Sequence, residues 1–292
     1  MLSSWLRSIR IRFLLASVIA VSVGLALSWW KFQQFDLFYA LLTYAGVLCL
    51  HASVDLLNDY WDYKRGIDKL TKRTPFSGGT GVLPENLLKP SSVYAAGLVF
   101  LAIGTSIGIY FVAVRGITIA IILAFAILSI YFYSTSIVNA GLGELFIAIK
   151  GVMIVLGTLF VQATQITLEP LYVGAIVGLL SASVLFVNSF PDYDADRAKG
   201  RRTLVIIMGK KKASNFFAFF PSVAYSLIGI GILLNMTTIY SLICLAAIPL
   251  AINADRKLKQ NHDDVSTLIP AMSSTVKFSR LAGALLALSF IL

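Results

Sequence analysis

The chain has 292 residues, of which 58% are hydrophobic and only 13% are charged. Soluble globular proteins carry about 25% charged residues, so this composition, with a mean hydropathy of +0.84, excludes an ordinary soluble domain, a disordered chain and a disulfide scaffold. The formal net charge of +10 is interpreted as basic loops that face anionic lipid or an anionic substrate, and not as a nucleic-acid-binding surface.

The predicted elements, taken along the chain, are nine apolar runs, most of them close to the roughly 20 residues that a membrane-spanning helix needs. They occur at 13–30, 37–57, 93–114, 117–133, 142–161, 171–190, 216–234, 239–252 and 278–292. The eighth and ninth runs are the shortest. The sequence therefore predicts an all-α polytopic membrane protein with a bundle of about nine transmembrane helices.

The basic residues indicate how these helices are oriented. With nine spans, 21 of the 24 Lys and Arg residues fall on one side of the membrane. Lys31 and Arg115 fall on the other side, and Lys150 falls inside a span. Because positive charge is retained in cytoplasmic loops, we expect the basic side to face the cytoplasm from a multi-pass position in the cell membrane.

Two polar segments, each after an even-numbered span, carry regularly spaced acids. The first contains Asn58 and Asp62, and the second contains Asn188, Asp192 and Asp196. Residues four apart lie on one face of a helix, so each set is expected to point in one direction.

The two segments also resemble each other. Both read Asn-x-x-x-Asp-Tyr and reach a basic pair and a threonine some fifteen residues later. This pattern predicts a single domain over 1–292 with two four-helix pseudo-repeats, 13–138 and 142–253, a final helix at 278–292, and a site between the halves. The alternative is chance similarity between two polar loops.

Oxygen ligands from both segments would favour Mg²⁺, which often bridges carboxylates to substrate phosphates. The candidate metal ligands are Asn58, Asp59, Asp62, Asn188, Asp192 and Asp196. Basic residues follow each acid set, as a diphosphate site requires. The candidate diphosphate-binding residues are Asn58, Lys72, Arg73, Asn188, Lys199 and Arg201. For either segment alone, a solvated loop with positive-inside charge is the alternative.

The motifs resemble those of a known family. Asn58-Asp59-Tyr60-Trp61-Asp62, followed by Gly66 and Asp68, is similar to the first aspartate-rich motif of the UbiA superfamily of intramembrane prenyltransferases, and Asp192-Tyr193-Asp194-Ala195-Asp196 is similar to the second. The spacing to Asp68, the Ser77-Gly78-Gly79 segment and Gly141-Leu142-Gly143-Glu144 resemble the 1,4-dihydroxy-2-naphthoate polyprenyltransferases of menaquinone biosynthesis. The chain departs from the family at Arg10, which no proline follows, at Asp55, where an asparagine is common, and after Tyr133, where other subfamilies carry a lysine.

This resemblance implies Mg²⁺-dependent transfer of a polyprenyl group from an allylic diphosphate to an aromatic acceptor, with Mn²⁺ as an alternative metal and membrane lipid as a further partner. For dihydroxynaphthoate it implies loss of the ring carboxylate as carbon dioxide. The candidate catalytic residues are Asp68, Lys72, Arg73, Tyr133 and Glu144. Asp68 or Glu144 could orient or deprotonate an acceptor hydroxyl, or be structural.

The sequence is also compatible with other interpretations. A related prenyltransferase could use 4-hydroxybenzoate or geranylgeranylglyceryl phosphate as acceptor, and a transporter would also have duplicated halves. Charges inside a membrane are costly, so Lys150 and Asp55 are functional candidates by default, although each could pair with a neighbouring span. We expect His51, one turn before Asp55, to bond to it.

Overall fold

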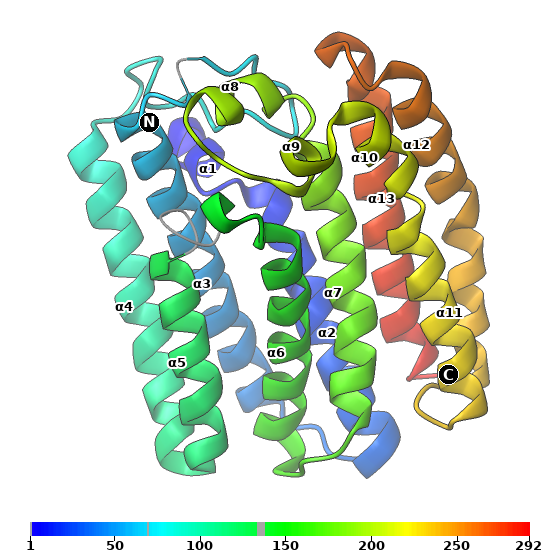
Figure 1. The fold of residues 1–292 in the computed structure, drawn as a ribbon. Coiled ribbons are helices and arrows are strands. Elements are labelled where there is room, and N and C mark those ends of the chain that lie inside the picture. The colour runs from blue at the N-terminus through cyan, green and yellow to red at the C-terminus, as the bar shows by residue number, and fades with distance from the viewer. Residues whose placement is uncertain (1, 69, 133–137) are drawn as a thin grey trace.

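The computed structural model describes residues 2–68, 70–132 and 138–292. These residues contain helices and no strands, as the composition predicted. The long helices run side by side in one bundle (Figure 1). They are α2 (Ile11–Phe32), α3 (Leu37–Lys64), α4 (Pro90–Arg115), α5 (Ile117–Phe132), α6 (Gly143–Ala163), α7 (Glu169–Asn188), α11 (Phe219–Leu233), α12 (Ile248–Asn261) and α13 (Val265–Ser289).

Short helices complete the fold, most of them at one end of the bundle (Figure 1). They are α1 (Leu2–Ser8), the 3-10 helix η2 (Val138–Ala140), α8 (Tyr193–Ala198), α9 (Leu204–Met208), α10 (Lys210–Phe216) and the 3-10 helix η3 (Ile239–Ala247). α10 leads into α11, and η3 leads into α12.

Seven helical stretches in the described part of the chain are long and apolar enough to cross a membrane. The protein is therefore a multi-pass membrane protein, but the predicted count of nine is not confirmed. The run at 117–133 forms α5, which has only 16 residues. The run at 278–292 forms part of α13, which is not one of the seven, because Lys277, Arg280 and several serines and threonines lower its mean hydropathy. The division into two repeated halves stays a prediction.

Small residues bring α6 and α7 unusually close together. A Cβ atom added at Gly151 would lie 2.6 Å from the Cα of Gly178, and one added at Gly174 would lie 2.6 Å from the Cα of Val152. Helices in membranes pack through such small residues because lipid supplies no hydrophobic drive for association. This contact fixes α7, which carries the second acid segment, against α6.

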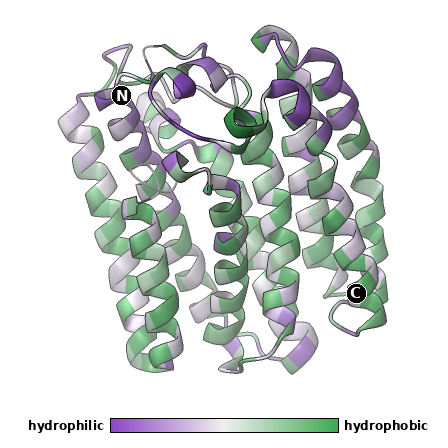
Figure 2. Cartoon of the chain, in the orientation of Figure 1, coloured by the Kyte–Doolittle hydropathy of each residue, from purple (hydrophilic) through white to green (hydrophobic). Residues whose placement is uncertain are grey.

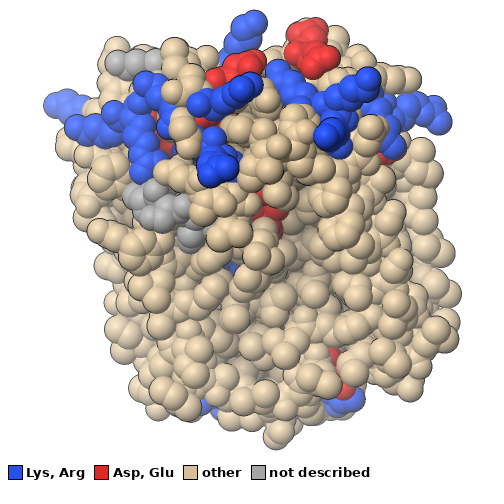
Figure 3. Space-filling view, in the orientation of Figure 1, with Lys and Arg blue, Asp and Glu red and all other residues tan. Residues whose placement is uncertain are grey.

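The two ends of the bundle differ in polarity. The long helices are mostly hydrophobic along their length, and hydrophilic residues collect at the end where α8, α9 and α10 lie (Figure 2). Lys and Arg gather over the same end (Figure 3). Both acid segments reach this basic end.

Candidate active site

The first acid segment lies at the C-terminal end of α3, which continues beyond the predicted apolar run to Lys64. Asn58 and Asp62 are one turn apart, and the amide of Asn58 donates to Asp62 Oδ2 at 3.1 Å. Both side chains line the same cavity. The spacing of four residues therefore brings them to one helical face.

The second acid segment is not one continuous helix. α7 ends at Asn188, and α8 begins at Tyr193 with Asp192 as its N-cap residue. Pro191 lies in the turn between them, and a proline disfavours helical geometry in the residue before it. Asn188, Asp192 and Asp196 nevertheless all line the cavity, so the turn preserves the common direction that helical spacing predicted.

Arg201 brings the two acid segments together. One terminal nitrogen of its guanidinium donates to Asp196 Oδ1 at 3.1 Å, and the other contacts Asp62 Oδ1, 139 residues earlier in the chain. The Arg201 side chain is only 10% exposed. The acids of the two segments thus meet around one buried cation.

Two oxygen atoms in this cluster are buried without a hydrogen-bond partner in the described structure: Asn188 Oδ1 and Asp192 Oδ1. The other oxygen of Asp192 accepts the backbone N–H of Gly78 at 3.3 Å. Burial raises the pKa of Asp192 well above its usual range, and the neighbouring Asp196 adds to the shift. A cation at this point would favour the ionised carboxylate.

These donors fit Mg²⁺ in part. Among residues 2–68, 70–132 and 138–292, no three His, Cys, Asp or Glu side chains converge into a metal site by themselves. Mg²⁺, however, is commonly held by one or two protein carboxylates together with water and substrate phosphates. The partnerless oxygens of Asn188 and Asp192 therefore suit a cation that arrives with a diphosphate.

Asp59 points away from this cluster. It is fully buried, accepts the backbone N–H of Thr80 at 3.0 Å and the Thr80 hydroxyl, and lies 3.4 Å from Arg10 Nη2. It is not part of the cavity lining. Asp59 follows Asn58 directly, and one residue along a helix turns the side chain by about 100°, so Asp59 anchors the segment around Thr80 while Asn58 faces the cavity.

The candidate general bases lie outside the cavity lining. Asp68 is buried beside Gly79, and burial raises its pKa to about 8, with Asp59 and Asp62 adding to the shift. Glu144 is buried at the start of α6. Neither lines the cavity. Tyr133 lies outside the described residues.

Of the predicted diphosphate-binding cations, the structure brings Arg201 to the cavity and not the others. Lys72 and Lys199 are exposed and lie outside the lining. Arg73 and Arg7 both pair with Glu85, and these hydrogen bonds, Arg7 first, lower the pKa of Glu85 to about 2.

Two cations that sequence reasoning did not select line the cavity: Arg10, before α2, and Arg280, in α13. The carboxylates around Arg10, Asp55 and Asp59 foremost, outweigh its burial and raise its pKa. The backbone N–H of Gly78 was likewise missed as a donor to Asp192. No spacing pattern links these residues to the acid segments, and the sequence signal for Arg10 and Gly78 was the family resemblance alone.

The cavity itself combines a polar end with an apolar interior. It encloses about 430 Å³ and extends from the acid cluster into the bundle. Apolar side chains from several helices line its depth, among them Ile107, Phe111, Ile122 and Ile154. Such a cavity suits an amphipathic ligand with an anionic head and a hydrocarbon tail.

Comparison with known proteins agrees with this chemistry. The sequence matches the UbiA prenyltransferase family over residues 17–274. It is 29% identical to the 1,4-dihydroxy-2-naphthoate octaprenyltransferase of Escherichia coli, over 99% of this chain and 95% of that protein. It is 25% identical to the Bacillus subtilis enzyme of the same name, over 96% of this chain and 89% of that protein.

A similar solved structure is that of a UbiA homologue from Archaeoglobus fulgidus bound to GPP and Mg²⁺. It has a TM-score of 0.70 and 16% identity, covering 97% of this chain and 99% of that one. The chain therefore belongs to the UbiA prenyltransferase family and is a prenyltransferase. The transporter interpretation is set aside.

Proposed function

We propose that this UbiA-family enzyme transfers a polyprenyl group from an allylic diphosphate to 1,4-dihydroxy-2-naphthoate, with Mg²⁺ as the metal and Mn²⁺ as a substitute. The observation that carries the proposal is the meeting of two acid segments around Arg201 at the polar end of an apolar cavity. The names of the two bacterial relatives support the choice of acceptor.

In this proposal the donor diphosphate lies at the acid cluster and its tail lies in the apolar part of the cavity. Asn58, Asp62, Asn188, Asp192 and Asp196 would hold the Mg²⁺. When bound, the cation would neutralise charge that develops on the departing diphosphate oxygens.

The chain's own donors would then act on the same group. Arg201, at the centre of the cluster, and Arg10, at its edge, can donate charge-assisted hydrogen bonds to diphosphate oxygens. These donors favour cleavage of the bond between the allylic carbon and the diphosphate oxygen, because they stabilise charge on the leaving group. The acceptor ring then forms the new carbon–carbon bond, and the ring carboxylate leaves as carbon dioxide.

The active site is further proposed to lie on the cytoplasmic side of the membrane. Since Lys and Arg gather at the end of the bundle that carries both acid segments (Figure 3), the positive-inside rule favours a cytoplasmic active site in the cell membrane.

The test is product identification. Purified protein receives geranylgeranyl diphosphate, Mg²⁺ and equal amounts of 1,4-dihydroxy-2-naphthoate, 4-hydroxybenzoate and geranylgeranylglyceryl phosphate, and mass spectrometry identifies the products. We expect the prenylated, decarboxylated naphthalenediol to dominate. A product formed from one of the other two acceptors alone would show that the acceptor assignment is wrong.

A further inference from the structure

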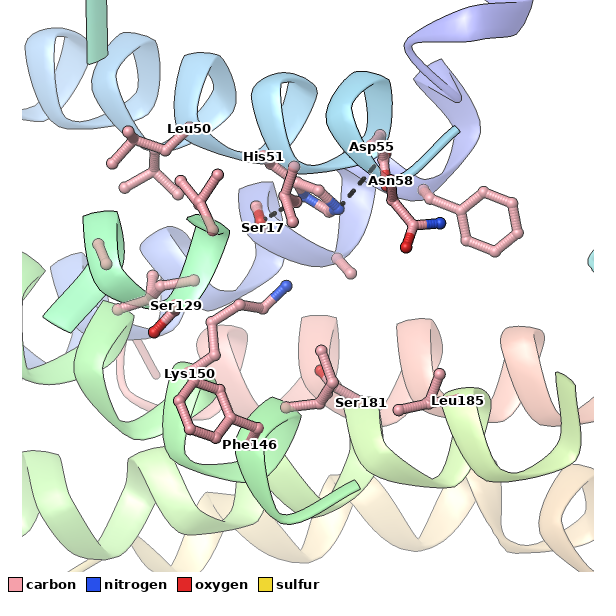
Figure 4. Close-up of a pocket in the computed structure, with 18 of the residues that line it drawn as sticks. Ser17, Leu50, His51, Asp55, Asn58, Ser129, Phe146, Lys150, Ser181 and Leu185 are labelled. Atoms are coloured by element: carbon pink, nitrogen blue, oxygen red, sulfur yellow. Dashed lines mark hydrogen bonds and ion pairs between the residues drawn. The ribbon is translucent and has the colours of Figure 1, made fainter. Parts of the chain in front are cut away.

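A polar group lies in the apolar interior of the cavity, apart from the acid cluster. It consists of Ser17 on α2, His51 and Asp55 on α3, and Lys150 on α6, all of which line the cavity. Asp55 precedes Asp62 by seven residues, which places it about 10 Å deeper along the helix axis. Figure 4 shows the ammonium group of Lys150 directed across the cavity toward the side where Ser17, His51 and Asp55 lie.

Two of these residues are hydrogen-bonded to each other, and a third lies close to them. His51 Nδ1 lies 2.7 Å from Ser17 Oγ, and His51 Nε2 lies 3.8 Å from Asp55 Oδ2. The imidazole therefore connects α2 to α3. Asp55 is a neighbour of His51, but the expected hydrogen bond between them is not formed at this distance. The hydrogen-bond partner of His51 is Ser17, which no spacing rule predicted.

Lys150 and Asp55 retain unused polar atoms. No carboxylate in the described part of the chain lies within ion-pair distance of Lys150. Asp55 Oδ2 is buried and accepts no hydrogen bond there. Charged groups among transmembrane helices are costly and are retained where they bind a partner, so the two side chains together indicate a ligand with one anionic group and one donor.

The wall beside Lys150 is aromatic. Phe146, one turn earlier on α6, stacks on Phe125 of α5 with ring centroids 5.4 Å apart and planes at 16°. Both rings line the cavity. A flat aromatic ligand can pack against such a pair, with its polar substituents toward Lys150 and Asp55.

The other cavity cations each have a hydrogen-bond or ion-pair partner within the protein. Arg10 pairs with Asp59, and Arg280 donates to the backbone carbonyl of Arg12. Arg201 is engaged by Asp62 and Asp196. Lys150 differs from these three arginines because its ammonium group faces the apolar interior of the cavity, and no carboxylate lies within ion-pair distance of it in the described part of the chain.

We propose that Lys150 determines acceptor specificity by binding the carboxylate of the aromatic acceptor, while Asp55 Oδ2 accepts a ring hydroxyl on the opposite wall. The inference rests on the proposed function for the reaction, but it extends to any carboxylated hydroxyarene. It makes Lys150 a specificity-determining residue and assigns it no part in binding the donor diphosphate.

The experiment compares two acceptors that differ only in the carboxylate: 1,4-dihydroxy-2-naphthoate and 1,4-dihydroxynaphthalene. With the second, a ring proton leaves in place of carbon dioxide. We expect the wild-type protein to prefer the first in kcat/KM. Lys150→Met should lower kcat/KM for the carboxylated acceptor about 10- to 100-fold, mainly through KM, since it removes a charged hydrogen bond. It should leave the KM of the donor unchanged.

Two further variants complete the comparison. Lys150→Arg keeps the cation and should retain more of the preference for the carboxylate than Lys150→Met does. Lys31→Met is the matched control, because Lys31 pairs with Glu169 at 2.7 Å and does not line the cavity. It should leave the preference unchanged.

The outcomes separate this inference from the proposed function. If the wild type uses 1,4-dihydroxy-2-naphthoate and all Lys150 variants keep its preference over the naphthalenediol, the inference is overturned and the proposed function stands. If the wild type instead prenylates 4-hydroxybenzoate in a manner that depends on Lys150, the acceptor assignment fails and the inference stands.

Discussion

Arg201 is the residue on which the geometry of the acid cluster depends. Its planar guanidinium contacts Asp62 from the first segment and Asp196 from the second, which a lysine could not do in the same way because its ammonium group is a single point of charge. One buried cation between two carboxylates balances only part of the negative charge, since the Asp192 carboxyl also lies close enough to interact with that of Asp196. The cluster is thus suited to a further cation that carries a diphosphate.

The first prediction distinguishes a proposed metal ligand, Asp192, from a nearby acid that binds no metal, Asp194. Asp192→Ala removes a partnerless oxygen from the cavity and should lower kcat by about two to three powers of ten, the usual cost of a principal electrostatic contact. Asp194→Ala is the control, because the Asp194 side chain is 84% exposed and pairs with Lys210 at 3.4 Å. Steady-state rates at saturating substrates would be compared. If both variants express normally and lose kcat equally, the assignment of Asp192 as a metal ligand is contradicted.

Residue spacing predicted part of this site and missed the rest for a physical reason. Helical periodicity correctly placed Asn58 and Asp62 on one face. It could not place Arg10, which reaches the cavity through the packing of segments far apart in the sequence. Nor could it tell that Lys72, close to the acids in sequence, faces solvent.

At the scale of elements, the contact between α6 and α7 holds the site in register. Gly151 and Gly178 let the two backbones touch, and the same two helices carry Lys150 and Asn188. Any separation of α6 from α7 would therefore move Lys150, the proposed acceptor-binding residue, relative to the acid cluster. This is the reason to expect small residues here, rather than larger apolar ones.

The second prediction tests that contact. Gly151→Ala would place a methyl group 2.6 Å from the Gly178 Cα. Because a backbone atom cannot move aside as a flexible side chain can, we expect the free energy of unfolding to fall by about 1–3 kcal/mol. Gly229→Ala in α11 is the control, since nothing lies within 4 Å of its added Cβ. Alanine should be neutral or slightly stabilising there. Thermal unfolding in detergent measures the stability of both variants. If Gly229→Ala lowers the stability as much as Gly151→Ala does, the close contact between α6 and α7 is not the cause.

Element boundaries were predictable only where composition changes sharply. The apolar run at 37–57 forms a helix that extends to Lys64, because polar residues continue the helical spacing beyond the membrane core. The run at 171–190 ends early at Asn188, since Pro191 follows. The run at 239–252 begins as the 3-10 helix η3 and only then becomes α12, a change that hydropathy does not encode.

For the whole molecule, the most informative property is the separation of charge. The basic residues gather at the end that holds both acid segments (Figure 3), and Lys31 at the far end of α2 is paired with Glu169. A charge difference of this kind orients a membrane protein during insertion. It would also attract an anionic diphosphate to the entrance of the site.

The third prediction concerns orientation. In a background with Cys49→Ala and Cys244→Ala, single cysteines at Lys72 and Lys211, both exposed, should react with a membrane-impermeant maleimide only from the cytoplasmic side. A cysteine at Lys31 should react only from the other side. Labelling of the Lys72 and Lys211 positions from opposite sides would contradict both the orientation and the shared site.

The measurement that tests the central claim most directly is metal-dependent donor binding. A non-cleavable thiolodiphosphate analogue of geranylgeranyl diphosphate would be titrated into the purified protein, first with Mg²⁺ and then with EDTA. The account predicts binding in Mg²⁺, loss of binding in EDTA, recovery when Mg²⁺ is restored, and weak binding to Asp192→Ala in either condition. Equal affinity of the wild-type protein with and without the metal would contradict it.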